Sequence, residues 1–120
     1  MKTSQDPRHQ NRIALVKQLY TYDFQKTPEK EIEDIITKLE EIDTLIASVA
    51  TDHPLSEINK VDLAILRLGV FELMEGKVKP EIIFDEAIET AKEFGAEHSP
   101  KFINAVLSTI AKKRTDETTK

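Results

Sequence analysis

One stretch of this chain decides its fold, residues 58–111: INKVDLAILRLGVFELMEGKVKPEIIFDEAIETAKEFGAEHSPKFINAVLSTIA. Three helical patterns follow one another here. The first runs from Val61 to Met74 and is apolar at most positions, which is typical of a central helix that is buried on all sides. It is too short to cross a bilayer and is interrupted by charged residues. Gly76 follows it and suits a left-handed helix end.

The other two patterns carry clear start and stop signals. The second begins at Pro80, repeats apolar residues at helical spacing and ends at Gly95. The third begins with Ser99 and Pro100, a residue that can cap a helix followed by a residue suited to the first helical position. Its apolar residues share one face: Phe102, Ile103, Val106, Leu107 and Ile110.

The upstream half predicts further helices. Arg8–Phe24 and Glu29–Ala50 both repeat apolar residues at helical spacing, and the second has room for one long helix or two short ones. A short helix is expected near residues 55–61. No strand pattern is found. We therefore expect an all-α fold: a compact single-domain bundle of six or seven helices over residues 8–114, with a flexible basic arm at 1–7 and a disordered tail at 115–120.

Composition excludes several functional classes. The 120 residues include no cysteine, which rules out disulfides, thiolate metal sites and cysteine nucleophiles. No segment resembles a signal peptide or a membrane span, so a cytoplasmic protein is expected. The histidines do not cluster with other metal ligands, and neither a glycine-rich phosphate loop nor a nucleophile elbow is present. We expect no cofactor, no metal and no enzymatic activity.

Charge is distributed unevenly, although the net charge is only -5. Residues 1–20 hold four cations and one carboxylate, whereas residues 29–43 hold seven carboxylates and two cations. Arg8 and Arg12 are four residues apart and share a helix face, and Lys17 lies elsewhere on the wheel. This helix either follows a phosphate backbone or presents an ordinary solvated face. The acidic segment likewise fits a basic partner or a solvated surface.

The turn from Phe94 to Lys101 is a second candidate site. The start of the last helix offers unpaired backbone N–H groups beside Lys101, an arrangement that favours anions. Phe94 next to Gly95 could stack on a nucleobase. Alternatively, Phe94 is a core residue and Ser99 is only a helix cap.

Two segments carry a resemblance to a known family. INKVDLAILRLGVFEL (58–73) and FDEAIETAKEFGAEHSPKFINAVLSTIA (84–111) resemble the C-terminal half of the NusB family of bacterial transcription antitermination factors. The first helix, with LYTYDF around Tyr20, is similar to the family's start more loosely. The resemblance implies a non-enzymatic helical protein, either monomer or homodimer. It also implies binding to boxA-type single-stranded RNA with ribosomal protein NusE, within the RNA polymerase antitermination complex.

The resemblance also implies which residues contact RNA. By position, the family's RNA contacts correspond to Arg8, His9, Arg12, Tyr20, Asp62, Phe94, Glu97, His98, Ser99 and Lys101. The family's N-terminal arginine run is diluted here to PRHQNR at residues 7–12. Fewer neutralised phosphates should weaken RNA binding and flatten its salt dependence. Asp85 replaces the usual asparagine, His98 stands where an acidic residue is frequent, and the segment from residue 25 to 52 is short.

Other functions remain open on sequence grounds. The diluted arginines fit a protein-interaction module of NusB type that has weak or lost RNA binding. An accessory domain in ribosomal RNA modification is a further alternative, because some RNA methyltransferases carry a similar domain. Since the chain contains no βαβ pattern for a methyl donor, it could not methylate RNA alone.

Overall fold

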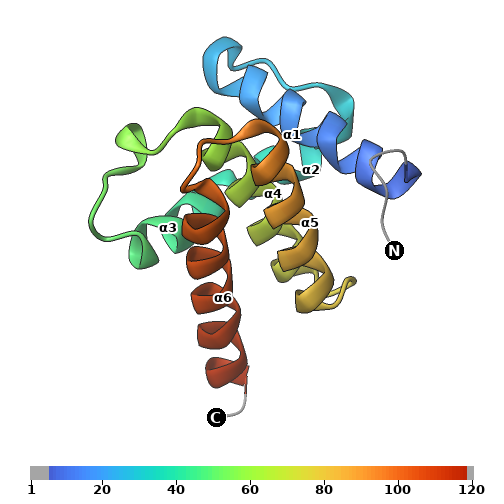
Figure 1. Cartoon of the computed structure of the whole chain (residues 1–120). Coiled ribbons are helices and arrows are strands. Elements are labelled where there is room, and N and C mark those ends of the chain that lie inside the picture. Colours follow the sequence, from blue (N-terminus) through green and yellow to red (C-terminus); the bar gives the residue numbers. More distant parts are fainter. Residues whose placement is uncertain (1–5, 119–120) are drawn as a thin grey trace.

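The computed structural model describes residues 6–118. Over these residues the chain folds into helices joined by turns (Figure 1). Within these residues there are six α-helices and two short 3-10 helices. They are α1 (Pro7–Gln25), η1 (Lys30–Ile32), α2 (Glu33–Thr37), α3 (Leu39–Val49), η2 (Leu55–Glu57), α4 (Lys60–Glu75), α5 (Pro80–Phe94) and α6 (Ser99–Thr118). The all-α prediction with six or seven helices is confirmed. The radius of gyration, 13.5 Å, matches the value of about 13.6 Å expected for a compact domain of this length.

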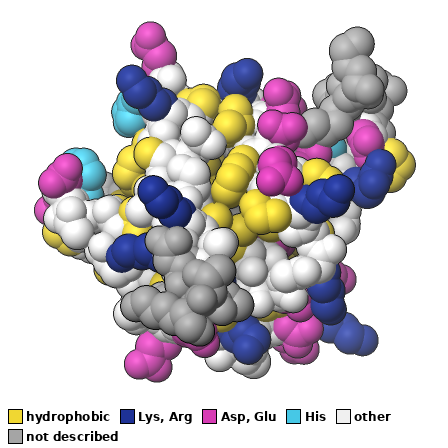
Figure 2. Space-filling model, turned by 90° about the horizontal axis from the view of Figure 1, so that it is seen from below, with side chains coloured by type: hydrophobic (Ala, Val, Ile, Leu, Met, Phe, Trp, Pro, Cys, Tyr) yellow, Lys and Arg dark blue, Asp and Glu magenta, His cyan; other side chains and the backbone are white. Residues whose placement is uncertain are grey.

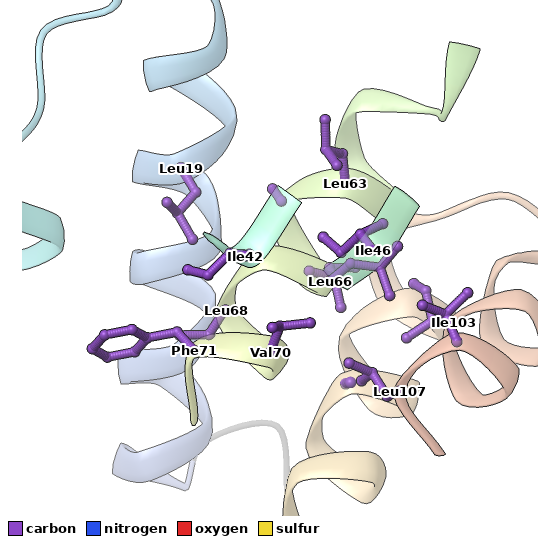
Figure 3. Packing of buried hydrophobic residues seen from close by; sticks show 14 of the residues in the cluster. Leu19, Ile42, Ile46, Leu63, Leu66, Leu68, Val70, Phe71, Ile103 and Leu107 are labelled. Carbon is purple, nitrogen blue, oxygen red and sulfur yellow. The ribbon is translucent and has the colours of Figure 1, made fainter. Parts of the chain in front are cut away.

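Helix α4 is the centre of the structure. Every residue from Asp62 to Phe71 is buried, and α1, α3, α5 and α6 all pack against it. Figure 3 shows side chains of α1, α3, α4 and α6 converging, with Leu19, Ile46, Leu66 and Leu107 among them. Burial on every side explains why the pattern of this segment is apolar nearly all round.

The ends of α4 follow directly from its sequence. Asn59 caps the start, where its side-chain oxygen accepts hydrogen bonds from the N–H groups of Val61 (2.8 Å) and Asp62 (3.2 Å). Gly76 ends the helix with φ 70°, a conformation that L side chains rarely adopt. Gly69 lies against α6, since a Cβ there would come within 2.9 Å of Leu107 Cδ1.

The sequence allowed either one long helix or two short helices in Glu29–Ala50. The prediction of one long helix is wrong. The segment forms η1, α2 and α3, with a break at Lys38, whose φ of -108° departs from helical geometry. The apolar pattern is still satisfied, because Ile32, Ile35, Ile42 and Ile46 are all buried. The break lets the first part pack near α1 and the second part against α4 and α6, which a straight helix could not do.

The predicted domain ends also differ from the structure. Pro7, assigned to the arm, is the first residue of α1, and Asp6 caps that helix by accepting a 2.8 Å hydrogen bond from the N–H of Arg8. Residues 1–5 lie outside the described part. Helix α6 continues to Thr118, past the predicted end at Arg114, and the Thr115 hydroxyl donates to the carbonyl of Ala111. Residues 119–120 lie outside the described part.

An ion-pair network joins α1, α3 and α4. The guanidinium of Arg67, which is 7% exposed, donates two hydrogen bonds to Asp43 (3.0 and 2.9 Å) and one to Asp23 (3.1 Å). Lys60 Nζ lies 2.8 Å from the other oxygen of Asp23. Burial raises the pKa of Asp23, but the hydrogen bonds and charges of Lys60 and Arg67 outweigh it, and the net shift is downward from 3.8.

The lowered pKa of Asp23 predicts a specific acid dependence of stability. Its contribution is complete above pH 3.8 and is lost as the pH falls through the lower folded-state pKa. We expect Asp23→Asn to reduce the free energy of unfolding by about 1–3 kcal/mol at pH 7. The difference from wild type should shrink as the pH falls below 3.8. Urea unfolding at several pH values measures it, and a pH-independent difference would contradict the assignment.

Candidate nucleic-acid interface

The basic residues of α1 have different environments. The side chain of Arg8 is 93% exposed and lies beside Asp6. The side chain of Arg12 is only 13% exposed and is hydrogen-bonded to Glu72 of α4. The expected row of exposed cations is therefore divided, with Arg8 facing solvent and Arg12 packed against the bundle.

His9 and Arg12 belong to one buried polar cluster. His9 Nδ1 lies 2.8 Å from Glu86 Oε1 on α5, and Arg12 Nε lies 3.8 Å from the same oxygen. Burial raises the pKa of Glu72, and the charge of Arg12 opposes this rise only in part. Because its partners come from α1, α4 and α5, the cluster holds these three helices together.

An exposed aromatic surface lies toward the C-terminal end of α1. Tyr20 and Phe94 are 39% and 42% exposed, and Phe24 packs edge-on against Tyr20 with ring centroids 5.1 Å apart. Tyr20 and Phe94 both line an open groove of about 120 Å³. The alternative that Phe94 is a core residue is therefore excluded.

Lys17 also lies at this surface, although it is not among the ten candidate contacts named from the sequence. Its Nζ lies 5.6 Å from the centroid of the Phe94 ring, and it lines the same groove. The helical wheel placed Lys17 away from Arg8 and Arg12, which is correct. The wheel could not show that α5 ends beside it, because that is a tertiary contact.

The turn between α5 and α6 is tightly packed around Gly95. A Cβ on Gly95 would lie 2.7 Å from Ser99 Cβ and 2.8 Å from the carbonyl oxygen of Ala91. Ser99 is fully buried, and its hydroxyl oxygen accepts a 2.9 Å hydrogen bond from the N–H of Ala96. Ser99 thus closes the turn, whereas Glu97, His98 and Lys101 point outward as exposed residues.

Asp62 of α4 interacts with Ser99 and His98 of this turn. It is 2% exposed at the start of α4. Burial raises its pKa, and a hydrogen bond with Ser99 and the charge of His98 oppose the rise only in part. Its Oδ1 has no hydrogen-bond partner among the described residues. The carboxyl group therefore lies beneath the turn and not on its outer face.

The ten sequence-predicted residues thus fall into two groups. Six are at the surface: Arg8, Tyr20, Phe94, Glu97, His98 and Lys101. Four are buried or mostly buried: His9, Arg12, Asp62 and Ser99. The buried four hold α1 and the α5–α6 turn in place around the exposed aromatic residues.

A larger groove of about 730 Å³ lies at the other end of α1, beside the α4–α5 turn. It carries charges of both signs, with Arg8, Lys77 and Lys79 near Asp6 and Asp85. Figure 2 shows the face seen from below, where hydrophobic side chains are surrounded by acidic and basic ones without a region of single sign. Among residues 6–118, this end offers no uniformly basic surface for phosphates.

Clustered metal ligands and membrane-spanning helices are both absent from the part of the chain that the structure describes. No group of three or more His, Asp or Glu side chains comes together there as a metal site would require. None of the helices in residues 6–118 has the length and apolar character needed to cross a membrane.

Comparison with known proteins decides the family. The NusB family profile matches residues 30–112. The chain belongs to the NusB family. The resemblance seen in the sequence is therefore confirmed, and it extends upstream into η1, α2 and α3, where the shortened segment had left the match open.

Individual NusB proteins support the assignment. The transcription antitermination protein NusB of a Nitratiruptor species is 35% identical over 127 residues, covering 88% of this chain and 91% of that protein. NusB of Campylobacter hominis is 40% identical over 90 residues, covering 75% and 69%. The solved structure of T. maritima NusB aligns with a TM-score of 0.77 at 33% identity, covering 93% of each chain. The chain is a NusB-family antitermination factor.

The buried cluster predicts different costs for two arginine substitutions. Arg12→Met leaves Glu72 buried without its partner, so we expect it to lower the free energy of unfolding by about 3 kcal/mol. Arg8→Met is the matched control, and because Arg8 is exposed its effect should stay within about 0.5 kcal/mol. Urea unfolding of both variants checks this, and equal effects would refute the structural role of Arg12.

The packing at Gly95 predicts a local distortion. Gly95→Ala forces a Cβ against Ser99 and a backbone oxygen, so we expect a loss of about 1–3 kcal/mol. The backbone amide NMR signals of Ala96 and Ser99 should shift. In Gly76→Ala the new Cβ meets nothing within 4 Å, so the cost comes from the positive φ and these signals should stay in place. Unchanged signals in Gly95→Ala would contradict the packing argument.

Proposed function

We propose that this chain acts as a non-enzymatic antitermination factor that binds boxA-type single-stranded RNA together with ribosomal protein NusE. In this role it would join the RNA polymerase antitermination complex in the cytoplasm and promote processive transcription of ribosomal operons. Family membership supports the general role. The RNA and NusE contacts are the proposed part.

The exposed aromatic surface is the observation that carries the RNA proposal. Single-stranded RNA is recognised through unstacked bases that lie on aromatic side chains, with cations near the phosphates. Tyr20 and Phe94 are exposed beside one groove, and Lys17 lies at the Phe94 ring. Lys101 adds a further cation on the neighbouring turn, where Glu97 and His98 are also exposed. Aromatic rings with this much exposed surface are suited to stacking.

The buried residues have an indirect role in this proposal. Ser99 and Asp62 set the turn that carries Glu97 and His98. His9 and Arg12 fix α1, and with it Tyr20, against α4 and α5. Their substitution should weaken RNA binding indirectly, by displacing α1 or the turn.

A second candidate function is supported by the same cluster. Arg12 is held by Glu72, so fewer cations of α1 reach the surface than the sequence implies. This favours a NusB-type protein-interaction module that binds NusE with little RNA affinity of its own. The two candidates differ in whether the chain binds RNA specifically.

Fluorescence anisotropy with a labelled boxA-type RNA, with and without NusE, tests the proposal. We expect specific binding that becomes tighter with NusE and about tenfold weaker in Phe94→Ala, because one stacked base is lost. Ile82→Ala is the control, since Ile82 is an exposed apolar residue at the opposite end of the same helix. Binding of NusE without specific RNA binding would establish the interaction module. Binding of neither would refute both candidates.

A further inference from the structure

The cations of α1 are not equally available to a ligand. Arg12 is hydrogen-bonded to Glu72, so its departure would leave the mostly buried carboxylate of Glu72 without this partner. Lys17 has no carboxylate partner among the described residues. Its ammonium contacts the face of the Phe94 ring.

The groove beside Lys17 has the chemistry of a base-binding surface. Ile13, Val16 and Val61 line it with apolar atoms, and the exposed rings of Tyr20 and Phe94 stand beside them. Lys17 is the charged residue of this lining. An apolar groove with exposed aromatic rings and one cation matches a nucleotide, which joins a stackable base to an anionic phosphate.

We propose that Lys17 is an RNA-contacting residue of this chain, whose ammonium moves from the Phe94 ring to a backbone phosphate when a base stacks on that ring. The inference rests on the proposed RNA-binding function and names the cation of that same site. It assigns to Lys17 the phosphate contact that the sequence had predicted for Arg12.

The exchange is physically favourable. A cation over a ring at an exposed site is held weakly, whereas an ion pair with a phosphate releases a condensed counterion from the RNA. Lysine carries its charge on a flexible four-carbon stem, so the ammonium can leave the ring while its Cα stays in place on α1. The base then covers the ring face that the ammonium has left.

The positive charge of the groove also favours RNA over a basic protein segment. Lys17 would repel a cationic peptide placed on Phe94, and the groove offers no carboxylate to compensate among its described lining residues. NusE is the competing occupant of this groove, and the experiment distinguishes NusE binding from RNA binding.

Salt titrations of RNA binding test the assignment. Anisotropy of the labelled boxA-type RNA is measured from low to moderate potassium chloride for wild type, Lys17→Gln, Lys17→Arg and Lys38→Gln. Lys38 is an exposed lysine at the α2–α3 break and serves as the charge-matched control. One lost phosphate contact should reduce the slope of log K against log salt by about 0.7 and weaken binding about fivefold at 0.1 M salt.

The outcomes separate the inference from the function on which it rests. Support requires the slope change in Lys17→Gln, its restoration in Lys17→Arg and wild-type behaviour in Lys38→Gln. A wild type that binds RNA with Lys17→Gln unchanged would overturn the inference alone. Loss of NusE affinity without loss of RNA affinity in Lys17→Gln would overturn it as well and assign the groove to the protein partner. A wild type that does not bind RNA would remove the proposed function and the inference together.

Discussion

The burial of one guanidinium, that of Arg67, constrains the whole arrangement. A charge on the central helix is stable only where carboxylates meet it, so Asp43 of α3 and Asp23 of α1 must both come to α4. These contacts determine where two helices distant in sequence cross the core helix. The hydrophobic cluster in Figure 3 supplies the bulk of the driving force, and the ion pairs select one arrangement of α1 on α4.

A second buried polar cluster completes the placement of α1. His9 and Arg12 near its start bind carboxylates of α4 and α5, and Asp23 near its end binds Arg67. With both ends held, the rotation of the helix about its axis is fixed. The face that carries Lys17 and Tyr20 is then turned toward the end of α5, where Phe94 lies. The exposed aromatic surface is thus a consequence of where the buried charges are satisfied.

Membership in the NusB family supports the general antitermination role, and the use of this surface for RNA is the proposed part. The diluted arginine run and the internal pairing of Arg12 both reduce the cations available at the start of α1. Stacking on exposed rings is less dependent on charge than phosphate binding is, so in the proposed function it would carry a larger share of RNA recognition. The compact turn at Gly95 and Ser99 follows directly after Phe94 and closes the end of α5.

The sequence by itself determined the helices, their capping signals and the central position of α4, because these depend on local periodicity and on burial that a continuous apolar run implies. Phe94 was a candidate contact because of its place beside Gly95, and Tyr20 was one only through the family resemblance. Only the tertiary structure decided that the segment after α1 breaks at Lys38, since the break serves packing against two different neighbours. It alone showed that Arg12 is bound internally and that Lys17 lies at the aromatic surface. Periodicity places a side chain on a helix face, but the partner that covers that face comes from residues far away in the chain.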